Sequence, residues 1–339
     1  MVLIINLVGD SQRGVIFAIT AAQFRGSYLQ QMSGPVDEIS GAPIAVLPPV
    51  DSVQSVRFAP TPSGYMHLGH AYSALIAWSN ARAVGSRFLL RIEDIDRSRC
   101  RPAFEQAIYE DLAWLGIDWQ LPVRRQAEHM ADYADALKVL GGLGVLYPCF
   151  CTRSEVQAEI EGANAAPHGP DGPHYPGTCR RLSRAEQNRR IRAGEAHALR
   201  LDMAKAAAIA GPLTWIDRKA GEVEADPLSA GDVVVARKDV PTSYHLAVTL
   251  DDHIQGVSLV TRGWDLYHAT HIHRLLQALL GLDTPVYYHH PMITDPNGVR
   301  LAKRNRAVTL RALRNGRKTL RDVRRMINLE PTDDERATP

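Results

Sequence analysis

The stretch of sequence that decides the fold lies at residues 55–70 and reads SVRFAPTPSGYMHLGH. Val56 to Pro60 predicts a buried strand, and the Pro, Ser and Gly residues after it predict a turn. We expect a helix to follow from about residue 69 to residue 84, with Gly85 as its stop. His67, Gly69 and His70 would then lie at a helix N-terminus, where N–H groups and the helix dipole favour a phosphate. Gly69 has no side chain, so a flat nucleoside could lie close to the backbone there.

Strand and helix patterns alternate along the rest of the chain. Such alternation is typical of an α/β fold in which parallel strands are joined by crossover helices. We therefore predict a doubly wound parallel sheet, with ligands bound at the carboxyl ends of its strands. The predicted elements are strands at residues 86–92, 232–236 and 243–250, and helices at 102–115, at 267–280 and from about residue 308 onward.

The composition changes between residues 149 and 230, where Pro, Gly, Arg and Ala are frequent and three of the four cysteines lie. We interpret this range as a small inserted subdomain. Residues 1–53 show no lasting period, so we expect either a poorly ordered extension or a start codon assigned too far upstream. The predicted organisation is an extension (1–53), the first half of the α/β domain (54–148), the inserted subdomain (149–230), the second half of the α/β domain (231–310) and a short helical tail (311–339).

The bulk composition is that of an ordinary globular protein. The 339 residues carry a formal net charge of +2, so the overall charge does not by itself indicate a nucleic-acid binder. Arginine is nonetheless dense at 180–200 and at 300–325, which predicts local basic surfaces. No apolar run reaches the about 18 residues that a membrane span needs, and the first residues lack the pattern of a signal peptide. We expect a monomer in the cytoplasm, with no membrane partner.

Three cysteines of the inserted range are close enough in sequence to bind one metal ion. Cys149 and Cys151 are separated by a single residue, and Cys179 follows a segment that holds histidines and a tyrosine. Zinc in a structural role prefers four ligands in a tetrahedron, and thiolates are among its usual ligands. By general chemistry a histidine, His168 or His174, would be the usual fourth ligand. The alternative is three reduced cysteines in a loop, with no metal.

Residues 57–70 closely resemble the first signature of the glutamyl- and glutaminyl-tRNA synthetases, which are class I enzymes. Residues 90–97, LRIEDIDR, resemble the second strand of the same family, and residues 241–262 continue the match. The resemblance covers roughly residues 55–310. It implies an ATP-dependent ligase with a Rossmann-type catalytic domain, which activates glutamate with ATP and Mg²⁺ and transfers it to RNA.

The resemblance also implies a site for glutamate, which carries two carboxylates and an ammonium group. Arg57 and Arg262 match the glutamate ligands of the family, and arginine suits a carboxylate because the guanidinium group binds it bidentately. Glu93 would bind the ammonium group, and Tyr244 would add a phenolic hydrogen bond. The predicted glutamate-binding set also includes two residues of the first signature, Ala59 and Thr61.

A second phosphate-binding element of this family is a lysine-rich loop, which here reads VRLAKRN at residues 299–305. The family pattern has Lys, an apolar residue, Ser and Lys. Arg300 replaces the first Lys and Ala302 replaces the Ser, whereas Lys303 keeps the last position. The positive charges that would stabilise the phosphates are thus retained. By this resemblance the catalytic residues are His67, His70 and Lys303, and the ATP-binding residues are His67, Gly69, His70, Arg300 and Lys303.

Other features resemble one branch of the family, the glutamyl-queuosine tRNA(Asp) synthetases. In that branch a tyrosine completes the zinc site, and the implied ligands here are Cys149, Cys151, Tyr175 and Cys179. The segment RGWDL at 262–266 and Val248 also look like this branch. Only 36 residues follow Lys303, too few for the helical anticodon-binding domain of longer synthetases, so we expect none.

The branch implies that glutamate is activated to glutamyl-adenylate without tRNA and is then transferred to queuosine in the anticodon of tRNA(Asp). Three alternatives stay open. They are a truncated, tRNA-dependent glutamyl-tRNA synthetase, a nucleotidyltransferase that ignores RNA, and a non-catalytic zinc-dependent RNA-binding module. The basic stretch at 180–200 counts against the second alternative, and the altered lysine-rich loop is the main support for the third.

Overall fold

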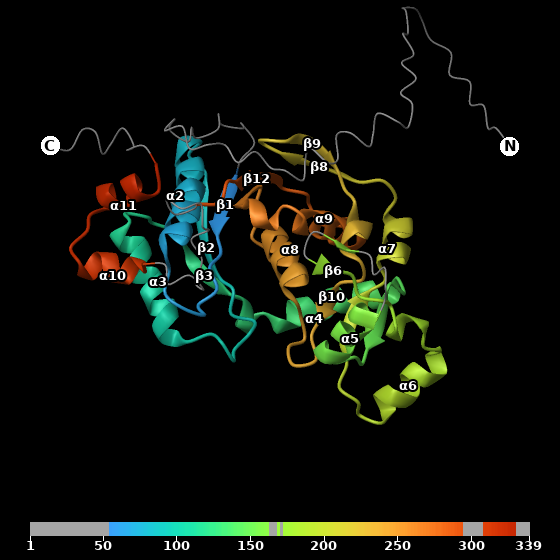
Figure 1. Cartoon of the computed structure of the whole chain (residues 1–339). Helices are drawn as coiled ribbons and strands as arrows, with labels where there is room; N and C mark the ends of the chain where they lie inside the picture. The colour runs from blue at the N-terminus through green and yellow to red at the C-terminus, as the bar shows by residue number, and fades with distance from the viewer. Residues whose placement is uncertain (1–53, 163–167, 170–171, 294–307, 330–339) are drawn as a thin grey trace, which may run out of the picture. The chain divides into compact units, whose positions relative to one another are not determined.

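The computed structural model describes residues 54–162, 168–169, 172–293 and 308–329 (Figure 1). The predicted extension, residues 1–53, lies outside the described residues. The strands are β1 (Ser55–Phe58), β2 (Arg87–Ile92), β3 (Gln120–Arg125), β4 (Leu146–Cys149), β5 (His168–Gly169), β6 (Gly172–Pro173), β7 (Ala198–Leu201), β8 (Thr214–Asp217), β9 (Gly221–Glu224), β10 (Val234–Ala236), β11 (Leu259–Gly263) and β12 (Val286–His290). The α-helices are α2 (Leu68–Ala83), α3 (Pro102–Trp114), α4 (Met130–Gly142), α5 (Arg153–Gly162), α6 (Arg184–Arg192), α7 (Met203–Ala210), α8 (Tyr244–Ile254), α9 (Ala269–Leu280), α10 (Leu310–Asn315) and α11 (Leu320–Met326).

A mostly parallel sheet forms the centre of the described residues and is called the large sheet here. Its seven strands follow the order β3-β2-β1-β11-β12-β8-β9, and every neighbouring pair is parallel except the β8–β9 hairpin. From β1 the chain steps outward to β2 and β3, and the later strands β11 and β12 step outward on the other side. Ligands of such sheets bind at the carboxyl ends of the strands where the order reverses, here β1 and β11. The prediction of a mostly parallel α/β sheet is confirmed.

Both faces of the large sheet are buried. Leu90 and Tyr288 pack in one apolar core with α2 and α3, whereas their neighbours Leu89 and Tyr287 pack in a second core around Trp215. Successive side chains of a strand point to opposite faces, so a strand buried on both faces reads as a continuous apolar run. This is why the sequence of β2 was recognisable. The C-terminal helices α10 and α11, red in Figure 1, pack against α3 and α2.

A second, antiparallel sheet takes its strands in the order β10-β7-β4 within the described residues and is called the small sheet here. The strand predicted at 232–236 corresponds to β10, which joins the small sheet and does not continue the large one. Conversely, β8 and β9 fall inside the range 149–230 and extend the large sheet. Sheet membership therefore does not follow the predicted boundary at residue 230, and the other domain boundaries stay predictions.

The strand predicted at 243–250 is wrong, because these residues form the helix α8. Ser243 caps the helix by accepting a hydrogen bond from the Leu246 amide, as serine commonly does. Leu246, Ala247 and Leu250 recur at helical spacing and are buried. Val248 and Thr249 are β-branched and so suit a strand, but tertiary burial decides the outcome here.

The other predicted elements correspond closely to observed ones: the strand at 86–92 to β2, and the helices at 69–84, 102–115 and 267–280 to α2, α3 and α9. Gly281 ends α9 with a φ of 65°, a left-handed conformation that favours glycine. None of the helices in the described part of the chain combines the length and the apolar character needed to cross a bilayer.

Candidate active site and cysteine cluster

Three adjacent parallel strands bring the predicted glutamate-binding residues to one edge of the large sheet. Arg57 is the third residue of β1, Arg262 is the fourth residue of β11, and Glu93 follows the last residue of β2. Because the strands are parallel and neighbouring, their carboxyl ends meet at the point where the strand order reverses. The register of the sheet therefore places residues from distant parts of the sequence side by side.

The Arg57 side of this edge is a buried network of ion pairs. Arg57 Nε donates to Asp252 Oδ1 at 3.0 Å, and Arg57 Nη1 donates to the Thr261 carbonyl at 3.1 Å. Arg91 Nη1 donates to the same Asp252 oxygen at 2.8 Å. Burial alone would raise the pKa of Asp252, but the charges of Arg57 and Arg91 outweigh burial and lower it. Asp252 is thus a carboxylate shared by two guanidinium groups.

Glu93 lies beside this network. Its amide donates to the Pro60 carbonyl at 3.0 Å, which joins the end of β2 to the turn after β1. Its carboxylate lies 3.4 Å from Arg91 Nη2. Burial raises the pKa of Glu93, and the charges of Arg91 and Arg57 oppose that rise. An incoming ammonium group would oppose it further, so the carboxylate is suited to a cationic ligand.

Tyr244, the first residue of α8, connects the two sides of the edge. Burial raises the pKa of its hydroxyl, the charge of Arg262 and the charge of Arg57 lower it, and the charge of Glu93 raises it. Tyr244 therefore lies within electrostatic reach of each of the other three residues. The structure thus brings together Arg57, Glu93, Tyr244 and Arg262, which the sequence distributes over about 200 positions.

Arg262 is held differently from Arg57. Its Nε donates to His289 Nε2 at 3.1 Å, its Nη1 lies 3.1 Å from His273 Nδ1, and its Nη2 donates to Thr270 Oγ1 at 2.6 Å. Arg262 is also 5.3 Å from the centroid of the Tyr287 ring. Within the described residues no carboxylate pairs with Arg262. Its positive charge is therefore not compensated by a direct protein partner.

The two histidines of the first signature lie at the start of α2. His67 is the N-cap of α2, and its Nδ1 accepts from the Gly69 amide at 3.1 Å. The His67 amide in turn donates to His70 Nδ1 at 3.1 Å. A neutral imidazole whose Nδ1 accepts carries its proton on Nε2. Both rings therefore hold an Nε2–H group, the kind of donor that a phosphate oxygen accepts.

The other predicted glutamate- and ATP-binding residues lie in a turn or outside the described residues. Ala59 and Thr61 lie in the turn between β1 and α2, and both are partly buried. Arg300 and Lys303, with Ala302, lie outside the described residues. The description resumes at Val308, next to Thr309, which forms an isolated β-bridge with His67.

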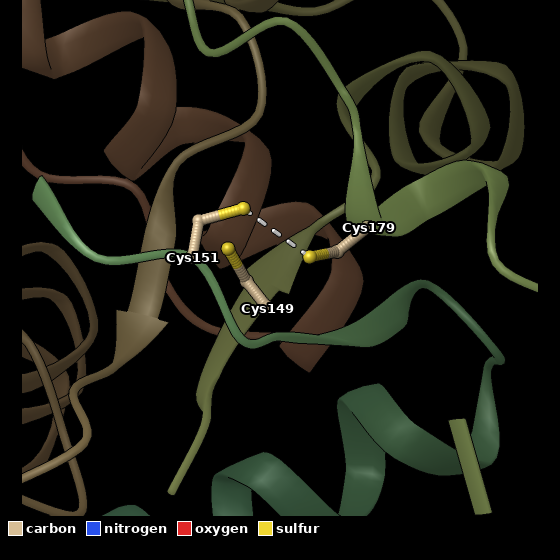
Figure 2. Close-up of side chains that lie close together, drawn as sticks. All are labelled: Cys149, Cys151 and Cys179. Atoms are coloured by element: carbon tan, nitrogen blue, oxygen red, sulfur yellow. Dashed lines mark hydrogen bonds between the residues drawn. The ribbon is translucent and has the colours of Figure 1, made fainter. Parts of the chain in front are cut away.

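The three cysteines of the inserted range converge with a tyrosine. The sulfur atoms of Cys149, Cys151 and Cys179 all lie within 4.8 Å of one another, and Figure 2 shows them pointing to a common centre. Cys151 Sγ is 3.4 Å from Cys179 Sγ. The Tyr175 hydroxyl lies 3.5 Å from the sulfurs of both Cys149 and Cys151. His174 instead bonds through Nε2 to the Ser229 carbonyl at 2.7 Å.

The two distances from the Tyr175 hydroxyl to sulfur match those of a tetrahedral metal site, whereas the Cys151–Cys179 sulfur distance is shorter than in such a site. With Zn–S bonds of about 2.3 Å and a Zn–O bond of about 2.0 Å, two sulfurs lie about 3.8 Å apart and a sulfur and an oxygen about 3.5 Å apart. Burial raises the pKa of Cys151 to about 12. Burial would also raise the pKa of Cys179, but the Tyr175 hydroxyl and the Phe150 amide lower it. A bound cation is what would make three such thiols ionise together.

Several residues of the site were not predicted from the sequence. Arg91, Asp252, His273 and His289 had no assigned role. One signal was present for Arg91, because an arginine within the apolar run of β2 must find a buried partner. The adjacent acidic residues at 251 and 252 offered such a partner, but the strand predicted at 243–250 ended just before them, so their place on α8 was not recognised.

Comparison with known proteins agrees with this geometry. The family described as tRNA synthetases class I (E and Q), catalytic domain, matches residues 53–325. The chain belongs to this family, and it is therefore an enzyme of the ligase type.

Within the family, several curated relatives carry the name Glutamyl-Q tRNA(Asp) synthetase. The protein from Rhodobacter capsulatus is 48% identical over 278 residues, which are 80% of this chain and 99% of the relative. The protein from Symbiobacterium thermophilum is 43% identical over 268 residues, 76% of this chain and 80% of the relative. The fold is similar to the crystal structure of glutamate-tRNA synthetase from Elizabethkingia anophelis, with a TM-score of 0.64, 27% identity and coverage of 75% of this chain. This chain spans about half of that structure, 53% of its length.

Proposed function

We propose that the chain activates L-glutamate with ATP to glutamyl-adenylate in the absence of tRNA, and then transfers the glutamyl group to queuosine in the anticodon of tRNA(Asp). One observation carries the first step: two arginines, a glutamate and a tyrosine converge at the carboxyl ends of β1, β2 and β11. The names of the relatives in Rhodobacter capsulatus and Symbiobacterium thermophilum support the second step.

The geometry supports a definite orientation of glutamate. An ammonium group is favoured beside Glu93, where two neighbouring carboxylates are already compensated by arginines. A carboxylate is favoured beside Arg262, whose protein partners are neutral. The reacting carboxylate then faces the start of α2. We assign Tyr244 as an additional hydrogen-bond donor between these two groups.

The nucleotide would lie at the start of α2, with the Nε2–H groups of His67 and His70 toward its phosphates. In the first step a glutamate carboxylate oxygen attacks the α-phosphorus and pyrophosphate leaves, with Mg²⁺ on the phosphates of ATP. Hydrogen-bond donors fixed before the reaction stabilise the charge that develops on the phosphate oxygens. We assign Lys303 and Arg300 to the same task. In the second step a queuosine hydroxyl attacks the glutamyl carbonyl carbon, and AMP leaves.

We further propose that Cys149, Cys151, Tyr175 and Cys179 bind one structural zinc ion. The convergence of the four donor atoms and the two oxygen–sulfur distances support this assignment. Zinc analysis of the purified chain should give one ion per chain, and Cys151→Ser should lower that ratio below about 0.2. Full occupancy in Cys151→Ser would remove Cys151 from the ligand set. The monomeric state and the cytoplasmic location stay predictions.

The experiment that tests the function is glutamate-dependent ATP–pyrophosphate exchange without RNA. Exchange with glutamate, and none with glutamine or aspartate, is the expected result. His70→Ala should lower the exchange rate. His253→Ala is the control and should not lower it, because His253 is a partly exposed histidine that contacts Asp283. Exchange that appears only after tRNA is added would instead support a truncated, tRNA-dependent synthetase.

The transfer step needs a separate arm. Labelled glutamate should be incorporated into tRNA(Asp) that carries queuosine and not into the same tRNA without it. Incorporation into tRNA(Glu) would contradict the proposal. RNA binding with a steep salt dependence and no exchange under any condition would favour a non-catalytic binding module.

A further inference from the structure

Asp217 is a fully buried carboxylate that belongs to none of the sequence signatures. It is the last residue of β8, whose parallel neighbour in the large sheet is β12. Its Oδ1 accepts from the amides of Lys219 and Ala220, at 2.8 and 3.0 Å, and so holds the β8–β9 turn. Its Oδ2 lies 2.7 Å from His289 Nδ1 and accepts from the His289 amide at 3.2 Å. One carboxylate oxygen thus accepts hydrogen bonds from the turn, and the other contacts His289.

The contact with Asp217 determines which ring nitrogen of His289 carries the proton. A carboxylate only accepts, so the Nδ1 that faces it must donate. Burial lowers the pKa of His289 to about 4, so the ring is neutral at pH 7 and holds a single proton. His289 Nε2 is then an acceptor. This agrees with its other contacts, since Arg262 Nε donates to it at 3.1 Å and the Thr270 hydroxyl lies 3.2 Å away.

We propose that Asp217 is a positioning residue for amino-acid binding, which acts by fixing the tautomer of His289 and thereby the orientation of Arg262. The proposal rests on the proposed function in that the ligand of Arg262 is taken to be a carboxylate of glutamate. It explains how a hairpin that lies far from every signature contributes to the site. Asp217 acts on Arg262 through the neutral ring of His289 and makes no ion pair with it. Arg262 is therefore oriented while its positive charge stays uncompensated by Asp217.

The chemistry of Asp217→Asn makes the inference testable. The asparagine carbonyl can still accept from the turn amides of Lys219 and Ala220, so the hairpin keeps those bonds. The asparagine NH₂ group would take the place of Oδ2, so the bond from the His289 amide would be lost. The same NH₂ group would face His289 Nδ1 and favour the other tautomer, with the proton on Nε2. That Nε2–H would then face the Nε–H of Arg262, and two donors cannot bond. Arg262 would lose the orientation that its three acceptors give it.

The first test reads the tautomer directly and needs no activity. In ¹⁵N-histidine-labelled protein the ring-nitrogen shifts separate a protonated from an unprotonated nitrogen, and His289→Gln identifies the signals of His289 by their loss. We expect protonated Nδ1 and unprotonated Nε2 in the wild type, and the reverse in Asp217→Asn. An unchanged His289 in Asp217→Asn, or protonated Nε2 in the wild type, would overturn the proposal. If the wild type shows no exchange with glutamate, the proposed function fails while this result still stands.

The second test is a double-mutant cycle in the exchange assay. Asp217→Asn should raise the KM for glutamate about tenfold, and the KM for ATP should not change. The glutamine of His289→Gln can present its carbonyl oxygen to Arg262 whatever residue stands at 217. In that background the effect of Asp217→Asn on the glutamate KM should fall below about twofold. Equal effects in both backgrounds would contradict a route through His289.

Asp232→Asn provides the matched control for loss of a buried aspartate. Asp232 accepts from the Tyr147 hydroxyl at 2.6 Å and from the Met203 amide at 3.0 Å, outside the candidate active site. The Asp232→Asn variant should have a lower melting temperature than the wild type and an unchanged KM for glutamate. If Asp232→Asn raised that KM as much as Asp217→Asn, a general loss of stability would explain both, and the positioning role would be rejected.

Discussion

Arg57 and Arg262 lie on neighbouring parallel strands, and the protein holds them in opposite ways. Arg57 is paired with the carboxylate of Asp252, which it shares with Arg91. Arg262 is bonded to two imidazoles and a hydroxyl. A buried guanidinium already paired with a carboxylate offers a ligand little uncompensated charge, whereas one held by neutral acceptors keeps its full attraction for an anion. From this difference we expect a mainly structural role for Arg57 and the main carboxylate-binding role for Arg262.

The surroundings of Arg57 and of Arg262 also differ in what a substitution would change. Removing one member of a buried ion pair leaves an uncompensated charge, which costs the fold more than the net value of the pair. Removing a cation from a set of neutral acceptors leaves only unmade hydrogen bonds. Substitutions on the Arg57 side should therefore appear mainly as lost stability, and those on the Arg262 side mainly as lost ligand binding.

The largest effect is expected for Arg262→Met. Loss of the charge that binds a substrate carboxylate should lower kcat/KM for glutamate about 10³-fold, since removing one partner of a buried charge-assisted contact costs about 2–5 kcal/mol. The exchange assay measures this. Arg274→Met is the matched control, because Arg274 lies on α9 and, among the described residues, donates to the Thr214 carbonyl at 2.8 Å and to no carboxylate. A drop of less than tenfold in Arg262→Met would refute the comparison.

Arg57→Met should act on the fold. Asp252 would keep Arg91 as its remaining partner, and we expect the free energy of unfolding to fall by about 3–4 kcal/mol. Urea unfolding measures the change, with Arg87→Met, an exposed arginine at the start of β2, as the control. If Arg57→Met unfolded at the same urea concentration as the wild type, its pairing with Asp252 would carry no structural weight.

The same contrast shows what the sequence could and could not predict. Arg57, Glu93 and Arg262 were predicted because each stands in a long signature or at the end of an apolar strand. Their partners were not, because the side chains of Asp217, Asp252 and His289 lie 27 or more residues away from the side chains that they hold. Asp252 lies just beyond the strand wrongly predicted at 243–250, and Asp217 was placed in the inserted subdomain. Pairing across parallel strands is set by register, which no local pattern reveals.

The cysteine cluster was easier to predict than the Arg262 site for a related reason. Cys149 and Cys151 are separated by a single residue, and metal binding is one of the few functions typical of two thiols at this spacing. The histidines around Arg262 have many possible roles, so their type alone indicated nothing. The three-stranded small sheet could not be predicted either, because its strands come from both sides of the predicted boundary at residue 230.

The pH dependence of stability distinguishes the Arg262 side, which contains His289, from the Arg57 side, which contains Asp252. Burial lowers the pKa of His289 from 6.5 to about 4, so the unfolded chain takes up a proton at a higher pH than the folded chain. The stability that depends on neutral His289 is thus complete above about pH 6.5 and is lost as the pH falls toward 4. A shift of this size corresponds to at most about 3 kcal/mol. The pKa of Asp252 is lowered from 3.8, so the stability that it contributes is lost only at lower pH.

His289→Gln checks this window. The difference in the free energy of unfolding between the wild type and His289→Gln should shrink between pH 7 and pH 4. Three other buried histidines of this region, His271, His273 and His290, and the partly buried His245 also have lowered pKa values and will steepen the pH dependence of both proteins. A difference that stays constant over this range would show that His289 is not buried in its neutral form.

The smallest effect is expected for the pair Thr270→Val and Thr261→Val, which removes one hydroxyl from each side. The Thr270 hydroxyl accepts from Arg262 Nη2 at 2.6 Å, so Thr270→Val should raise the KM for glutamate about five- to tenfold, equal to about 1–1.4 kcal/mol. The bond from Arg57 to Thr261 goes to the main-chain carbonyl, which valine also has. The Thr261 hydroxyl has no hydrogen-bond partner within the described residues. Thr261→Val should therefore leave the KM for glutamate unchanged and may be measured in the same exchange assay. A larger rise in Thr261→Val than in Thr270→Val would reverse the assignment of the two arginines, because the hydroxyl that matters to the ligand would then lie on the ion-paired side.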